Sequence, residues 1–225
     1  MKLTIIILLA ASTVIAQSFT VENISGTVKY QYNGSDKWIE LGKDMQISDD
    51  AIISTEENSS VQLGNGNITF NMGELSAVSI SSIKEMSIDD LLLALALEDV
   101  INAPKDTDES SENTAVYGTR ESETNSIKIK SNDFGIKRLN GAVQLSEMGF
   151  KESAVVVAKE TFRKYPATKI LPGYRIYFAN ILNDKGLYEE ALEEYKSISE
   201  LNLTETQNLE IEQKSELIRK KLLSE

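Results

Sequence analysis

Two residue types that carry much of enzyme and metal chemistry are missing: the 225 residues include no histidine and no cysteine. Histidine is the side chain that most often serves as a general base at neutral pH, and cysteine is the thiol nucleophile. Their absence excludes catalysis by a nucleophile–imidazole pair and most zinc or transition-metal sites. It also excludes disulfide bonds and a cysteine-linked lipid. We therefore expect no catalytic residue, no metal ligand and no cofactor.

Basic residues are scarce relative to acidic ones. The chain has 23 lysines and arginines against 35 aspartates and glutamates, which gives a formal net charge of −12. Such a chain repels phosphate backbones and anionic lipid headgroups. We therefore expect no nucleic-acid partner and no role at a membrane surface.

Long apolar runs are also absent, except at the N-terminus. Residues 3–16 are uncharged, follow Lys2 and end at Ala16. This pattern predicts a secretory signal peptide at residues 1–16, cleaved after Ala16. The alternative is a retained membrane anchor, but the run is shorter than the about 20 apolar residues that a spanning helix needs.

Export has two consequences for the mature chain. Loss of Lys2 leaves 22 basic and 35 acidic residues, a net charge of −13. Cysteine-free exported proteins are more typical of a bacterial periplasm than of an animal secretory pathway. We expect a periplasmic or secreted protein with no stable membrane insertion after cleavage.

Residues 19–80 have the alternating pattern of half-buried strands. Apolar residues flank a single polar residue in several short runs, such as Val61 and Leu63 around Gln62. Gly64 and Gly66 lie between two such runs and predict a hairpin loop. Trp38 is interpreted as a semi-buried aromatic rather than a ligand platform. Asp49 and Asp50 are interpreted as turn residues rather than cation ligands.

The pattern changes at residue 87. Ser87 and the acids after it predict a helix over residues 87–102. Apolar residues surround this helix, so it needs cover on more than one side, and we expect it to pack against the sheet or the helical domain. The alternative is an exposed helix that binds a partner. Residues 104–113 predict an acidic loop, and residues 114–119 and 126–130 predict further strands.

From residue 134 onward the apolar spacing is helical. The pattern predicts helices over residues 139–147, 151–165, 174–184, 188–200 and about 204–223. Thr204 and Gln207 form the capping-box signature of the last helix. Ile211, Ile218 and Leu222 give it one apolar stripe.

The β region resembles the FecR-type domain of bacterial envelope proteins. The resemblance rests on residues 21–28 (VENISGTV), 38–42 (WIELG), 47–55 (ISDDAIIST), 60–63 (SVQL) and 114–120 (TAVYGTR). It implies a small β-sandwich over about residues 19–131. Sensors of that family carry a sigma-factor-binding region and a membrane helix before the domain, whereas here the domain follows the predicted signal directly. Anti-sigma activity is therefore not expected.

The C-terminal region resembles tetratricopeptide repeats. Gly149 and Gly186 are 37 residues apart, and so are Ala154 and Ala191. The usual repeat has about 34 residues, so a short insertion near residues 169–173 is implied. The resemblance implies a peptide-binding groove lined by the first helix of each pair. The candidate groove residues are Tyr177, Asn180 and Asn183, with ordinary surface positions as the alternative.

The expected fold is multidomain, all-β and then all-α: a small β-sandwich or β-roll followed by a stack of α-helical repeat hairpins. The predicted divisions are the signal peptide at 1–16, a FecR-like β domain at 17–131, and a tetratricopeptide-like domain at 134–225. The β domain includes the helical insertion 87–102 and the acidic loop 104–113.

Three functional hypotheses follow. The leading one is a non-catalytic envelope protein that binds or scaffolds another envelope protein or peptide. The second is an accessory component of a FecR-type signalling system. The third, a glycan hydrolase with paired carboxylates, is the weakest, since no pattern marks a pair of acids as buried.

Overall fold

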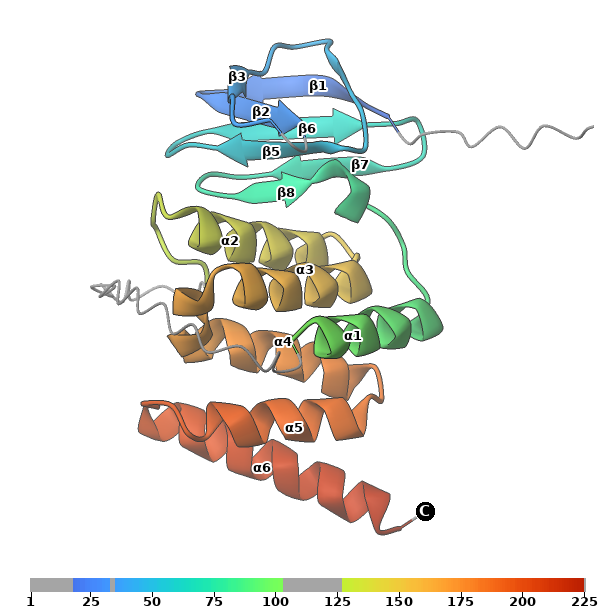
Figure 1. Cartoon of the computed structure of the whole chain (residues 1–225), viewed down its shortest axis with the longest axis vertical. Helices are drawn as coiled ribbons and strands as arrows, with labels where there is room; N and C mark the ends of the chain where they lie inside the picture. Colours follow the sequence, from blue (N-terminus) through green and yellow to red (C-terminus); the bar gives the residue numbers. More distant parts are fainter. Residues whose placement is uncertain (1–17, 33–34, 103–126, 225) are drawn as a thin grey trace, which may run out of the picture.

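The strands gather at one end of the molecule, and the helices continue from them to the C-terminal end (Figure 1). This computed structural model describes residues 18–32, 35–102 and 127–224, with Asp99 described by its backbone alone. Those ranges hold eight strands and six α-helices, so the protein is a mixed α and β fold. The predicted signal peptide, the predicted acidic loop and the predicted strand at 114–119 lie outside the described residues.

The strands form two antiparallel sheets of four. The first has the order β4-β1-β6-β7 and the second β3-β2-β5-β8. The first sheet contains β1 (Phe19–Ser25), β4 (Gln46–Ile47), β6 (Ser60–Gly64) and β7 (Thr69–Met72). The second contains β2 (Val28–Tyr32), β3 (Ile39–Glu40), β5 (Ala51–Thr55) and β8 (Ala77–Ser79), which leads into the short 3₁₀ helix Ile80–Ser82. Two-residue strands at one edge of each sheet leave little backbone open to another chain.

The β6–β7 hairpin confirms the period-two prediction. Leu63 lies opposite Phe70, and both side chains are buried. The side-chain oxygen of Asn65 accepts the backbone N–H of Ile68 at 2.8 Å inside the predicted loop. Alternating apolar residues and turn chemistry therefore determined this part locally.

In the part of the chain that the structure describes, six α-helices follow the eight strands. Their bounds are α1 (Ile88–Asn102), α2 (Phe134–Glu147), α3 (Lys151–Lys164), α4 (Pro172–Asp184), α5 (Tyr188–Ile198) and α6 (Glu205–Leu222). Helix α2 begins earlier than the predicted residue 139, because the Asp133 side chain caps it by accepting the Ile136 N–H. A 3₁₀ helix, Pro166–Ile170, lies between α3 and α4.

The α2–α3 and α4–α5 hairpins are built alike. Gly149 and Gly186 connect the helices of each pair, and both have positive φ, +97° and +81°. A left-handed residue after a helix favours glycine. Ala154 and Ala191 are fully buried in the first turn of the second helix of each pair. The 37-residue step in the sequence therefore relates the loop glycines and the buried alanines of these two hairpins.

Helix α6 ends the stack. The predicted capping box is confirmed: Thr204 Oγ1 accepts the Gln207 N–H, and the Gln207 side chain accepts the Thr204 N–H. Of the predicted stripe, Ile211 and Ile218 are buried, whereas Leu222 in the last turn is exposed.

Helix α2 joins the strands to the helices, and residues 135–146 are all buried although many are polar. Asn140 donates to the carbonyl oxygens of Leu75 (2.8 Å) and Ile129 (2.9 Å). The Tyr174 hydroxyl donates to Asn140 Oδ1 (2.5 Å) and accepts the Ile129 N–H (2.8 Å). This buried node connects the β7–β8 connection, α2 and α4.

A second set of contacts holds α2 against β7 and β8. Gln144 accepts the Gly73 N–H at 2.7 Å and donates to the Ser76 hydroxyl at 2.6 Å. Gly141 packs so closely on β8 that a methyl group there would lie 2.2 Å from the Ala77 carbonyl oxygen. Helix α2 therefore covers this end of the sheets with amide side chains that bond the backbone of the β7–β8 connection, and with a glycine at its closest approach to β8.

Two buried cations of α2 are also paired. Lys137 and Arg138 are each 4% exposed, and they contact Glu56 and Glu160 at 2.7 Å. In the described part of the chain, no buried side-chain nitrogen or oxygen lacks a hydrogen-bond partner. One continuous hydrophobic core includes side chains from both sheets and from the helices.

The predicted strand at 126–130 is wrong for the residues that the structure describes. Residues 127–130 form no strand. The backbone of Ile129 is bonded by the side chains of Asn140 and Tyr174 rather than by a neighbouring strand. The alternating isoleucines do pack against the core, but the residues that bond this segment come from helices α2 and α4.

Candidate functional site

Helix α1 begins with a reciprocal cap. The Ser87 hydroxyl accepts the Asp90 backbone N–H at 3.1 Å and donates to the Asp90 carboxylate at 2.7 Å. Asp89 and Asp90 in the first turn also suit the positive end of the helix dipole. The helix spans residues 88–102, which confirms the predicted element.

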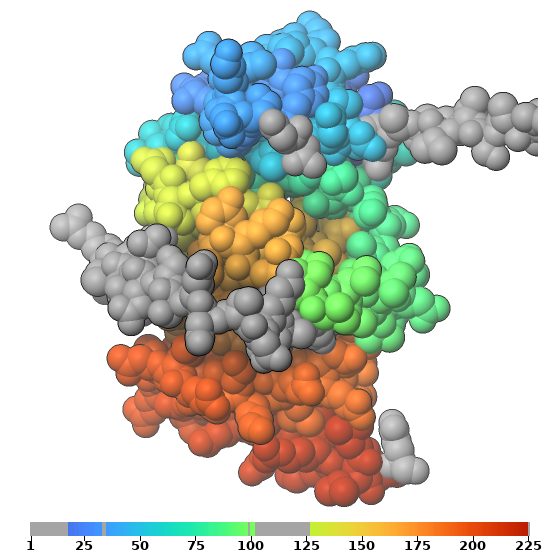
Figure 2. Space-filling view, in the orientation of Figure 1, coloured from blue at the N-terminus to red at the C-terminus, as the bar shows by residue number. Residues whose placement is uncertain are grey.

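One side of α1 attaches it to α3. Leu91 and Leu95 are buried on that side. Arg163 of α3 donates two hydrogen bonds to Glu98, at 2.7 and 3.3 Å. Figure 1 shows α1 beside α3, and Figure 2 shows it at the rim of the molecule. Ile88 is also partly buried against the core, and the rest of the helix surface is available for other contacts.

The opposite side of α1 is apolar and exposed. Leu93, Leu97 and Val100 are 61%, 54% and 73% exposed. Their spacing of four and then three residues puts them in one row along the helix. Leu92 and Ile101, 37% and 54% exposed, widen the row. Scattered exposed leucines are ordinary, whereas five large exposed apolar side chains gathered on one short helix are typical of interaction sites.

The charged residues of the helix that carries these side chains, hereafter the α1 row (Leu92, Leu93, Leu97, Val100 and Ile101), all have one sign. Helix α1 contains four acidic residues and no basic residue. Asp89 and Asp90 are exposed in its first turn, whereas Glu98 is occupied by Arg163. The α1 row is therefore an apolar surface with two exposed carboxylates at its N-terminal end.

The predicted groove residues all lie on α4, but they face different neighbours. The Tyr177 hydroxyl donates to Ser146 of α2 at 3.1 Å. Asn180 accepts the Tyr195 hydroxyl of α5 at 2.6 Å and donates to Glu210 of α6 at 2.8 Å.

Asn183 is half-buried and makes no side-chain hydrogen bond with another described residue. The amide of Asn180 is already used between helices. That these three residues bind a peptide stays a prediction.

Hydrogen bonds and ion pairs of charged and phenolic side chains near Asn180 connect neighbouring helices. Burial raises the pKa of Tyr195, and the nearby carboxylate of Glu210 adds to the shift, so the hydroxyl stays a neutral donor. Burial also pushes the pKa of Glu194 upward, but Lys159 and Arg175 outweigh it and hold that pKa below the ordinary value. These contacts link α3, α4 and α5, and they give the groups a structural role.

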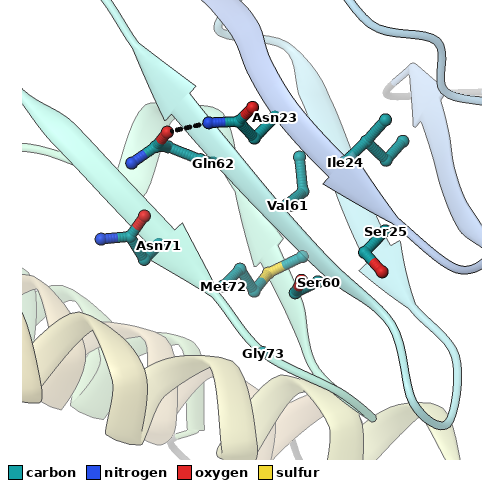
Figure 3. Close-up of a pocket in the computed structure, with 9 residues that line it drawn as sticks. All are labelled: Asn23, Ile24, Ser25, Ser60, Val61, Gln62, Asn71, Met72 and Gly73. Atoms are coloured by element: carbon teal, nitrogen blue, oxygen red, sulfur yellow. Dashed lines mark hydrogen bonds between the residues drawn. The ribbon is translucent and has the colours of Figure 1, made fainter.

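A shallow hollow of about 390 Å³ lies on the β1, β6 and β7 strands (Figure 3). Its lining is uncharged: Asn23, Ile24, Ser25, Ser60, Val61, Gln62, Asn71, Met72 and Gly73. Asn23 donates to Gln62 at 2.6 Å across neighbouring strands. The hollow can form hydrogen bonds but offers no carboxylate pair for acid–base chemistry.

The other sequence candidates have structural contacts. Trp38 is 38% exposed and packs edge-on against Phe134 at 5.6 Å between ring centroids. The carboxylate of Asp50 accepts the Ser48 hydroxyl at 2.5 Å, which fits the predicted turn. Among the described residues, no acidic cluster is placed to hold a metal ion, and no helix is long and apolar enough to cross a membrane.

Comparison of the chain with family models, curated proteins and solved structures finds no match.

The sequence predicted helix α1 itself but did not predict that the α1 row is exposed. The helix was expected to need cover on more than one side, yet the described residues cover one side only. Its composition was the available signal: apolar residues all around a helix whose only charges are acidic. Distinguishing a buried helix from a docking helix required knowledge of what packs beside it.

Proposed function

We propose that this chain is an exported, non-catalytic protein-binding or scaffolding module of the bacterial envelope, and that it binds its partner through the α1 row. The observation that carries the proposal is the exposure of Leu93, Leu97 and Val100 on one helix face. Burial of a leucine or valine side chain contributes about 1.5–3 kcal/mol. An apolar partner surface that covers this face would therefore gain binding free energy from each buried side chain.

The proposed architecture is a FecR-like β-sandwich followed by tetratricopeptide-like hairpins. The two four-stranded antiparallel sheets and their shared core support the first part. The equivalent glycines, Gly149 and Gly186, and the buried alanines, Ala154 and Ala191, support the second. Helix α6 would then serve as the cap of a two-hairpin stack.

The proposed absence of catalysis is supported by how two of the less exposed carboxylates are used. Glu194 faces Lys159 and Arg175, and Glu152 faces Lys185. Despite its burial, Lys159 and Arg175 hold the pKa of Glu194 below its ordinary value, so that carboxylate stays ionised and is poorly suited to donate a proton. Carboxylates used in this way do not favour the glycan-hydrolase alternative.

Export rests on residues 1–16, which we propose are removed as a signal peptide. The mature chain would act in the periplasm or be secreted. Its partner would be another envelope protein or peptide, and not a nucleic acid, because the net charge is strongly negative.

Photo-crosslinking in cells that produce the protein tests the binding proposal. A photoreactive residue replaces Leu97 on α1 or, as the control, Leu209 on α6, which has a similar exposed fraction of 50%. We expect a discrete adduct from position 97 that is absent from position 209 and lost when Leu93→Ser is added. Identical adducts from both positions, or none from position 97, would contradict the proposal.

A further inference from the structure

We infer that the partner of the α1 row is a basic amphipathic helix. This inference rests on the proposed function and goes beyond it, because it specifies the shape and charge of the partner. Three observations carry it: the straight apolar row, the acidic residues around it, and the sign of the charge on the alternative occupants.

The shape of the row favours a helix. Leu93, Leu97 and Val100 follow one line along α1. At 1.5 Å per residue, the apolar row from Leu92 to Ile101 is about 14 Å long, which equals about two and a half helical turns. Amphipathic helices bind such surfaces with apolar residues at matching i, i+3, i+4 and i+7 positions.

The charge of α1 favours a basic partner. All of its charged residues are acidic, and Glu98 is neutralised by Arg163. The exposed carboxylates of Asp89 and Asp90 lie at the N-terminal end of the row. A lysine or arginine flanking the apolar stripe of the partner would lie over this end and fix the orientation of the bound helix.

A second copy of the chain is a poor occupant for the same reason. In a parallel pairing of two α1 helices, the first-turn acids would face each other. In an antiparallel pairing, those acids would face the C-terminal end of the other helix, which carries the negative end of its dipole. Both arrangements bring like charges together, in a chain whose net charge is already −12.

The segment that follows α1 in the chain is unsuitable on charge as well. Residues 103–126 contain two basic and six acidic residues, a net charge of −4 from 2 minus 6. This segment would add negative charge beside Asp89 and Asp90. A separate, positively charged partner is the occupant that charge complementarity selects.

Fluorescence anisotropy with labelled synthetic peptides and the full-length chain tests the inference. The probe is an 18-residue peptide with leucines in one helical row and lysines elsewhere. Its comparators replace every lysine by glutamine or by glutamate, or scramble the row at constant composition. We expect the lysine peptide to bind at least tenfold more tightly than each comparator and to weaken several-fold between 50 and 500 mM salt.

Variants of the chain localise the binding. Leu97→Ser should weaken the lysine peptide at least tenfold, whereas Leu209→Ser should leave it unchanged. Asp89→Lys should weaken the lysine peptide several-fold but leave the glutamine peptide unchanged. The matched control is Glu205→Lys, which makes the same charge reversal in the first turn of α6.

The outcomes separate this inference from the proposed function. If the glutamine or glutamate peptide binds as tightly as the lysine peptide, the charge inference is overturned while docking on α1 stands. If no peptide binds but Leu97 still crosslinks in cells, the partner is not a basic helix. Association of the chain with itself or with phosphatidylcholine vesicles that Leu97→Ser abolishes would also overturn the inference. Loss of both readouts would remove the proposed function itself.

Discussion

Helices α1 and α2 have opposite relations between composition and burial. Helix α1 is mostly apolar, yet its Leu93, Leu97 and Val100 are more than half exposed. Helix α2 carries Lys137, Arg138, Asn140, Gln144 and Ser146, and all of these are buried. The difference shows that the neighbours of a helix, and not its hydrophobicity, decided how deeply each one lies.

The neighbours of α2 explain its burial. It lies between the ends of the sheets and helices α3 and α4, and each of its polar groups has a specific acceptor or donor there. Buried polar groups are tolerated when they are fully bonded and are costly when they are not. Helix α1 packs mainly against α3, and Leu93, Leu97 and Val100 on its other side stay exposed. Four predictions test this comparison.

The largest expected effect is loss of the Asn140 node. Asn140→Leu would remove the bonds to Leu75 and Ile129 and leave the Tyr174 hydroxyl without its acceptor. We expect a loss of about 4 kcal/mol in the free energy of unfolding, since each unsatisfied buried group costs about 1–3 kcal/mol. Urea unfolding measures it, with Asn183→Leu on α4 as the control. A loss below about 1 kcal/mol would mean that the node is not structural.

The second effect concerns the close approach of α2 to β8. Gly141→Ala should destabilise the protein by about 2–3 kcal/mol, because the new methyl group would overlap the Ala77 carbonyl oxygen. Gly173→Ala in α4 is the matched control, because its methyl group would meet its first neighbour at 3.8 Å. Thermal unfolding of both variants decides the matter, and equal midpoints would refute the tight contact.

The third effect is pH dependence from the cations of α2. A hydrogen bond from Lys137 lowers the pKa of Glu56. Burial raises the pKa of Glu160, but Lys164 and Arg138 outweigh it and hold that pKa below its ordinary value. Because both folded-state pKa values are lowered, their stabilisation is complete above the unfolded-state pKa of about 4.5 and is lost as pH falls through the folded-state values.

Urea midpoints between pH 3 and 6 should therefore fall with decreasing pH. Glu160→Gln should reduce stability at pH 7 by about 1–2 kcal/mol and flatten this acid limb. Glu216→Gln on α6, where the ion pair to Lys220 is exposed, serves as the control and should leave the slope unchanged. If Glu160→Gln loses stability with falling pH as steeply as the unmodified protein, the ion pair between Arg138 and Glu160 does not contribute to this pH dependence.

The smallest expected effect is on the uncovered side of α1. Leu97→Ser should change the free energy of unfolding by less than about 0.5 kcal/mol, because exposed substitutions rarely exceed that. Leu95→Ala on the covered side should cost about 2–3 kcal/mol. Chemical unfolding of the pair compares the two sides directly. A large loss for Leu97→Ser would show that this side is packed in the folded protein and would remove the basis for docking.

Most strands and helices were predictable because their signals act over a few residues. The alternation around Gln62, the capping box at Thr204 and the glycines at 149 and 186 each involve neighbours within one turn or one hairpin. Residues 127–130 were mistaken for a strand because alternation records a covered side without showing what covers it. The candidate site was less predictable: local patterns did not show that the Asn180 amide bonds Tyr195 of α5 and Glu210 of α6.

The sequence by itself determined most of the strands and helices, the acidic charge, and the absence of histidine and cysteine chemistry. Only the tertiary structure decided that polar α2 is buried and apolar α1 is left partly uncovered. The physical reason is the distance along the chain between interacting groups. Asn140 is matched by a carbonyl 65 residues earlier, and Leu93 lacks a comparable neighbour in the described chain. Local periodicity contains no record of such long-range partners.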